Sequence, residues 1–229
     1  MWKYSKSTDH QPGFTLVELA IVLVIIGLIL AAVLKGQEMI QNAKVKNVIN
    51  DLRGVSTAYY AYQDRFKAIP GDDANASTHF TGGINGNGDG IIAGLFNATA
   101  TPVDGATTES NKFWLSTRLA GFMTGSGSNP ATNALGGMLG IQDGNSTTGT
   151  VLGMTGPVAC VGNIPWKIAV AVDAVLDDGN SGTGTVRTGT QSATANVTPD
   201  TTAVTGIYGS SVTATTTLEA GMSTVCMKI

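Results

Sequence analysis

A long apolar run near the N-terminus constrains this chain more than any other feature. It extends from Phe14 to Leu34, and its one charged residue is Glu18. As a helix, these roughly 21 residues would rise about 31 Å, enough to cross a hydrocarbon core of about 30 Å. The run therefore predicts a membrane-spanning helix that carries one carboxylate near its start.

After Lys35 the pattern changes from uniformly apolar to amphipathic. Apolar side chains recur there at helical spacing, and they are Val45, Val48, Ile49, Leu52, Val55, Tyr59, Tyr62 and Phe66. Pro70 and Gly71 then supply a stop signal. We therefore expect the helix to continue out of the membrane to about Lys67, with its aromatic residues packed in a core.

The rest of the chain, 70–229, is predicted to form a β-rich globular head. Charged residues make up only 13% of the chain, and the C-terminal region alternates Thr and Val between glycine-containing loops. The elements that we expect are a helix between Thr108 and Gly121, a strand at Val151–Val161, a helix after Pro165, strands between Thr183 and Leu218, and a last strand at Met222–Ile229. The predicted fold class is α+β, with a long N-terminal helix packed on an antiparallel sheet.

The two cysteines, Cys160 and Cys226, have neither metal-ligand nor CxxC spacing. A disulfide formed in an oxidising compartment fits them best, and closing so long a loop would contribute on the order of 4 kcal/mol. Two buried free thiols are the alternative.

The junction between the polar leader and the apolar run carries a small residue, Gly13, on the N-terminal side of the run. A secretory signal has its cleavage site after the apolar region instead. A cut after Gly13 would keep the helix on the mature protein and free the amine of Phe14. That ammonium on a neighbouring copy could neutralise Glu18, which costs roughly 2.5–3.5 kcal/mol at the bilayer centre. The alternative is that Glu18 reaches the headgroups.

The stretch Gly13-Phe14-Thr15-Leu16-Val17-Glu18 resembles the processing and methylation motif of type IV prepilins and the related pseudopilins. The resemblance implies that a prepilin peptidase cuts after Gly13 and methylates Phe14, and that Glu18 is needed for assembly. It implies a leader at 1–13, a transmembrane and filament-core helix at 14–34, an amphipathic continuation at 35–69 and a head at 70–229. The cysteine pair is similar to the disulfide that brackets a C-terminal region in many pilins.

This resemblance also implies a function and a location. The expected role is a structural subunit of a type IV pilus, a homo-oligomeric helical filament; the alternative is a minor pilin or a type II secretion pseudopilin. Charges flanking the run do not decide its orientation. By resemblance, the precursor lies in the bacterial inner membrane with its leader inside, and the mature protein is in an extracellular filament.

One glycine-rich loop has the character of a calcium site. Side-chain oxygens alternate along it, and the candidate ligands are Asn85, Asn87 and Asp89. The second half of a calcium loop is missing, because Phe96 stands where an EF-hand has its bidentate glutamate. A more distant acid such as Asp72 or Asp73 would have to join. The alternative is a glycine-rich turn without a metal.

Composition and residue inventory argue against two other classes of function. The formal net charge is −3 and the isoelectric point about 5.2, so no nucleic-acid partner is expected. After cleavage, the only histidine would be His79. No phosphate-binding glycine loop or paired acids in an apolar setting accompany it, so the sequence predicts a protein that is not an enzyme.

Overall fold

The computed structural model describes residues 15–99, 108–146, 149–190 and 222–229. It contains two compact units, Met1–Asn42 and Ala43–Ile229. Helix α1, Leu16–Phe66, contributes to both units and confirms the predicted long N-terminal helix.

Helix α1 continues for 51 residues because nothing in its sequence stops it before Phe66. No proline interrupts this stretch, and an added Cβ at Gly27 or Gly36 would meet no atom within 4 Å, so neither glycine marks a close contact. The helix ends where Lys67 adopts a left-handed backbone with φ of 56°. The Lys67 N–H still donates to the Gln63 carbonyl at 2.9 Å, which satisfies one of the last carbonyls.

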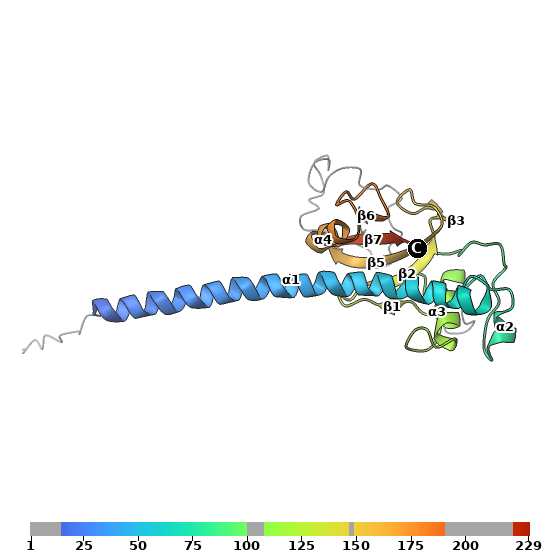
Figure 1. Ribbon diagram of the computed structural model, residues 1–229, viewed down its shortest axis with the longest axis horizontal. Helices are drawn as coiled ribbons and strands as arrows, with labels where there is room; N and C mark the ends of the chain where they lie inside the picture. Colours follow the sequence, from blue (N-terminus) through green and yellow to red (C-terminus); the bar gives the residue numbers. More distant parts are fainter. Residues whose placement is uncertain (1–14, 100–107, 147–148, 191–221) are drawn as a thin grey trace, which may run out of the picture. The chain divides into compact units, whose positions relative to one another are not determined.

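The head is built from short helices around one main sheet (Figure 1). Its helices are α2 (Ala76–His79), α3 (Glu109–Leu119) and α4 (Trp166–Leu176). Its strands are β1 (Ala131–Thr132), β2 (Met138–Asp143), β3 (Asn145–Ser146), β4 (Gly149–Thr150), β5 (Pro157–Pro165), β6 (Val186–Thr190) and β7 (Met222–Lys228). The main sheet has the order β1-β2-β5-β7-β6 with every pair antiparallel, and β3 pairs with β4 separately. The fold is therefore α+β, as predicted.

The fifth strand begins later than the sequence predicts. We expected a strand from Val151, but β5 starts at Pro157. Leu152, Gly153 and Gly156 all have positive φ, between 52° and 79°, which turns the chain and prevents an extended strand there. The helices expected before Gly121 and after Pro165 are present as α3 and α4. The strands expected between 191 and 218 lie outside the described residues.

The main core lies on one face of the sheet, and the C-terminal half of α1 belongs to it. Alternate strand residues supply the sheet side of this core, and they are Leu139, Ile141, Ala159, Val161, Val186 and Val225. Helix α1 contributes Val45, Val48, Ile49, Leu52, Val55 and Tyr59, while α3 and α4 contribute Phe113, Trp114, Ile168, Ala169 and Val172. Six of the eight residues of the predicted apolar stripe therefore pack in this core, while Tyr62 and Phe66 pack on Phe80 in the segment after the helix.

A second, smaller core covers the opposite face of the sheet. Because side chains alternate along a strand, the neighbours of the first set point the other way. This core contains Phe96, Val151, Leu152, Met154, Val158, Cys160 and Cys226. The sheet is thus buried on both faces, which explains why β2 and β5 contain long runs of buried residues.

Candidate assembly motif, acidic loop and disulfide

The first turn of α1 is closed by reciprocal hydrogen bonds between Thr15 and Glu18. The Thr15 N–H and the Thr15 hydroxyl donate to Oε2 of Glu18, at 2.9 and 2.8 Å. In return, the Glu18 N–H donates to the Thr15 hydroxyl oxygen at 3.3 Å. This arrangement is a capping box, in which a Thr before the helix and a Glu three residues later satisfy each other's backbone donors.

The capping box was missed by sequence reasoning, although the signal is in the sequence. Thr-x-x-Glu before an apolar run is the known pattern for a helix start, and it places the first helical residue at Leu16. The predicted cleavage and methylation residues, Gly13 and Phe14, lie outside the described residues. The roles assigned to them and to Glu18 therefore stay predictions.

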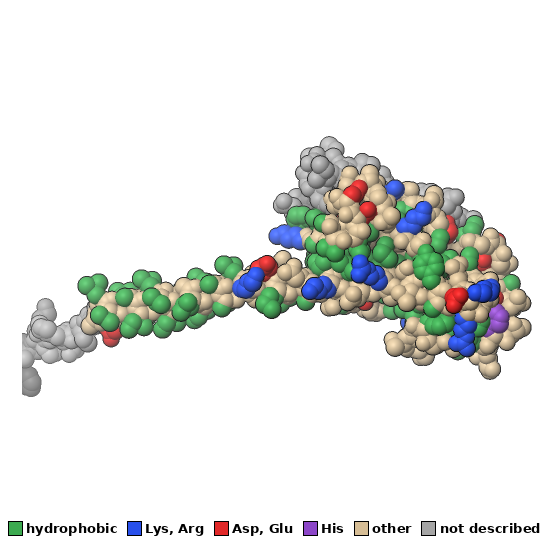
Figure 2. Space-filling view, viewed as in Figure 1, with side chains coloured by type: hydrophobic (Ala, Val, Ile, Leu, Met, Phe, Trp, Pro, Cys, Tyr) green, Lys and Arg blue, Asp and Glu red, His purple; other side chains and the backbone are tan. Residues whose placement is uncertain are grey.

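The N-terminal part of α1 exposes nearly all of its apolar side chains. Its large exposed residues are Leu16, Val17, Leu19, Ile21, Val22, Leu23, Val24, Ile25, Ile26, Leu28, Ile29, Leu30, Val33 and Leu34. Figure 2 shows apolar side chains along this part of the helix. By length and composition, α1 is the one helix among the described residues that could cross a membrane. So much contiguous apolar surface needs lipid or protein to cover it.

The predicted calcium loop brings one of its three candidate ligands to two other acids. Carboxylate oxygens of Asp89, Asp72 and Glu109 all lie within 4.8 Å of one another. The other two candidates have local partners instead. The Asn85 side-chain oxygen accepts the Ser77 N–H at 2.7 Å, and that of Asn87 accepts the Asp89 N–H at 3.0 Å.

Backbone amides of the loop donate hydrogen bonds to the two buried acids of this group, Asp72 and Glu109. The Gly88 and Gly90 N–H groups donate to the two oxygens of Asp72, at 2.6 and 2.7 Å. The Ala93 N–H donates to Glu109 at 2.9 Å. Both carboxylates are nearly inaccessible, with 4% and 5% exposure. These hydrogen bonds hold the glycine-rich loop in place. Calcium binding stays a prediction.

A second acidic group, Asp173, Asp177 and Asp178, lies at the end of α4. Asp177 accepts the N–H of Val186 at 2.8 Å, where β6 begins. The Thr183 hydroxyl donates to Asp178 at 2.6 Å, and this bond holds the pKa of the Asp178 carboxyl below its usual value. These contacts shape the turn that leads from α4 into β6.

A buried tyrosine, a carboxylate and a histidine join the end of α1 to the loop that follows it. The Tyr62 hydroxyl donates to Oδ2 of Asp73 at 2.7 Å, and Nδ1 of His79 lies 2.9 Å from the same oxygen. The other oxygen of Asp73 accepts the Asn75 N–H at 2.8 Å. Burial, followed by the bond to Asp73, raises the pKa of Tyr62. The hydroxyl binds the carboxylate and not the imidazole, so this is a structural tie and not the order of a nucleophilic triad.

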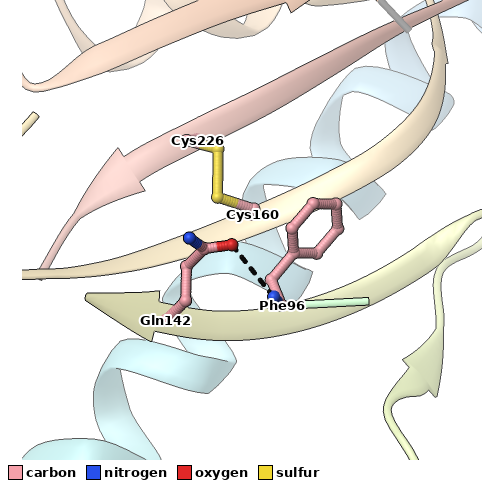
Figure 3. Close-up of a disulfide and its surroundings, with 4 residues drawn as sticks. All are labelled: Phe96, Gln142, Cys160 and Cys226. Carbon is pink, nitrogen blue, oxygen red and sulfur yellow. Dashed lines mark hydrogen bonds between the residues drawn. A yellow bond between two sulfur atoms is a disulfide. The ribbon is translucent and has the colours of Figure 1, made fainter. Parts of the chain in front are cut away.

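The disulfide between Cys160 and Cys226 is formed, and the alternative of two free thiols does not apply. The two residues are directly opposed in the β5–β7 register, with Cα atoms 4.1 Å apart and no exposure. Figure 3 shows the bond beside Phe96, whose N–H donates to the Gln142 side chain at 2.9 Å. The bridge therefore fixes the last strand in the middle of the sheet.

Comparison with known proteins adds evidence at the N-terminus. No curated protein and no solved structure matched the chain. Residues 9–34 match a family model described as the prokaryotic N-terminal methylation motif. This segment includes the capping box and the exposed apolar surface of α1. The motif implies processing by a prepilin peptidase and a membrane anchor, and the chain thus carries the signature of the type IV pilin and pseudopilin family.

Proposed function

We propose that this protein is a structural subunit of a type IV pilus. The subunit polymerises through the N-terminal part of α1 after a prepilin peptidase has cleaved the chain after Gly13 and methylated Phe14. The observation that carries the proposal is the combination of the methylation motif at 9–34 with a helix whose N-terminal part exposes its large apolar side chains. The role is structural and requires no catalytic site.

The exposed apolar surface supports two successive environments for the same helix. Before assembly, lipid of the inner membrane covers it, because about 20 apolar residues match the thickness of a bilayer. After assembly, the same helices of other copies cover it in the core of an extracellular filament. Apolar side chains suit both environments, since neither of them requires hydrogen bonds from the helix surface.

In this proposal, the charge of Glu18 favours assembly over the isolated helix in the membrane. Removing the carboxylate from water costs roughly 2.5–3.5 kcal/mol at the bilayer centre and less near an interface. An ammonium at Phe14 of a neighbouring copy would compensate that charge when the helices stagger. The charge thereby favours a filament of staggered copies over isolated helices in lipid.

The test compares Glu18→Ala with the matched control Glu38→Ala in cells that carry the assembly machinery. Glu38 is an exposed acid on the same helix, paired with Lys35 at 2.8 Å beyond the apolar run. We expect Glu18→Ala to be inserted and cleaved but to form no filaments, while Glu38→Ala assembles. Abundant normal pili in Glu18→Ala would overturn the pairing argument.

A second test asks whether the protein is the main subunit of the filament. Filaments are sheared from the cells, and the subunits in the sheared fraction are identified by mass and quantified. A shaft protein must dominate that fraction, whereas a minor pilin or a secretion pseudopilin would be a trace component. In a parallel experiment, Gly13→Glu should hold the precursor in the membrane. A mature N-terminus at Phe14 in that variant would refute the cleavage site.

A further inference from the structure

The Glu18 carboxylate is held in one position by its own chain before any partner arrives. Both donors of Thr15, the N–H and the hydroxyl, reach the same oxygen, Oε2, at 2.9 and 2.8 Å. Among the described residues, no hydrogen bond reaches the other oxygen, Oε1. The capping box therefore uses one side of the carboxylate and leaves the other side open.

We propose that Thr15 is a positioning residue for assembly: it fixes Glu18 so that Oε1 can accept the N-terminal ammonium of a second copy. This inference rests on the proposed function and assigns Thr15 a role in it. A carboxylate without Thr15 would rotate among several rotamers, and pairing would then have to immobilise it. The capping box makes that ordering part of the folded helix.

Cleavage after Gly13 leaves the capping box between Thr15 and Glu18 intact. A cut between Gly13 and Phe14 makes Phe14 the charged terminus, and the Thr15 nitrogen remains an amide that can still donate to Glu18. A cut one residue later would convert that donor into the ammonium itself. The mature chain can therefore offer both the fixed carboxylate and, one residue before the cap, the charge that a second copy needs.

Four variants of the full-length protein separate the cap from the charge. Thr15→Ser keeps the hydroxyl, and Thr15→Val removes it with little change in shape. Glu18→Gln keeps a side chain that a capping box accepts but removes the charge. Glu18→Ala removes both and tests the proposed function itself.

The measurement is the assembled fraction: the pilin in sheared filaments divided by the cleaved pilin in the same cells, with cleavage verified by mass spectrometry. We expect Thr15→Ser to assemble like the wild type and Thr15→Val to assemble about fivefold less, the size expected for a lost cap. Glu18→Gln should fail to assemble although its cap is intact.

The outcomes distinguish this inference from the proposed function. If Glu18→Ala fails and Thr15→Val assembles normally, Thr15 positions nothing and only the inference is lost. If Glu18→Gln or Glu18→Ala forms normal filaments, the charge is unnecessary and the proposed pairing fails with it.

Discussion

Replacing Tyr62 with Phe removes one hydroxyl from the interior of the head and leaves the ring in place. The ring packs on Phe66 and Phe80, with centroid distances of 4.6 and 6.2 Å, and those contacts do not involve the hydroxyl. The side chain has no exposure, so water cannot replace the lost bond. The substitution therefore removes the hydrogen bond from Tyr62 to Asp73 and the weaker interaction of the same hydroxyl with the Ser116 side chain.

The expected loss of stability in Tyr62→Phe follows from the acceptor of the hydrogen bond, Asp73. The bond is 2.7 Å long and its acceptor is a carboxylate that is only 3% exposed. Hydrogen bonds to charged groups contribute roughly 1.5–3 kcal/mol, and a buried acceptor loses that support when the donor is removed. Asp73 keeps His79 and the Asn75 amide as partners. We therefore expect a loss of about 2 kcal/mol, or roughly 4–8 °C in Tm for a domain of this size.

The assay is thermal unfolding of the full-length protein in detergent, followed by near-ultraviolet circular dichroism, with the disulfide intact. Tyr60→Phe is the matched control, because Tyr60 lies on the same helix and is 54% exposed. We expect its free energy of unfolding to stay within about 0.5 kcal/mol of the wild type. A Tm for Tyr62→Phe equal to that of Tyr60→Phe would show that the hydroxyl contributes nothing, and the structural role given to Asp73 would be wrong.

Three further predictions concern other parts of the unit Ala43–Ile229. Replacing both Cys160 and Cys226 with Ala should lower the free energy of unfolding by on the order of 4 kcal/mol in a urea titration, because the bridge closes a loop with a sequence separation of 66; equal stability of oxidised and reduced wild type would contradict this. Burial raises the pKa of the Asp51 carboxyl above its ordinary 3.8, so the folded state retains the proton longer than the unfolded state and stability falls as pH rises through that window. Asp51→Asn should therefore raise Tm at pH 7 but not at pH 3, and a Tm gain that is the same at both values would refute the argument. Calcium added to the full-length protein should give binding heat at up to millimolar concentration, and Asp89→Ala should abolish it; no heat from the wild type would remove the calcium hypothesis.

Local patterns were enough to predict the parts of this protein that depend on neighbouring residues. The apolar run from Phe14 and the stop at Pro70 bracket α1, because a helix forms its hydrogen bonds four residues apart and needs no distant partner. The helical spacing of apolar residues likewise predicted the stripe around Leu52 and Tyr59, which is buried. Even the missed capping box is local, since Thr15 and Glu18 are three residues apart.

Contacts between residues far apart in the sequence could not be predicted and are seen only in the folded chain. The calcium loop was interpreted from its own side chains, but Asp72 and Glu109, from separate segments, bind its backbone amides. No spacing in the sequence announces such contacts, because they depend on which surfaces pack together.

An apolar N-terminal helix with one carboxylate and a processing motif before it could be predicted, because these are properties of consecutive residues. Only the folded chain shows that β7 lies between β5 and β6, that Cys226 lies directly opposite Cys160, and that Asp73 is shared by Tyr62 and His79. The physical reason is that burial and strand pairing are properties of the packed chain, in which residues far apart in sequence compete for the same neighbours.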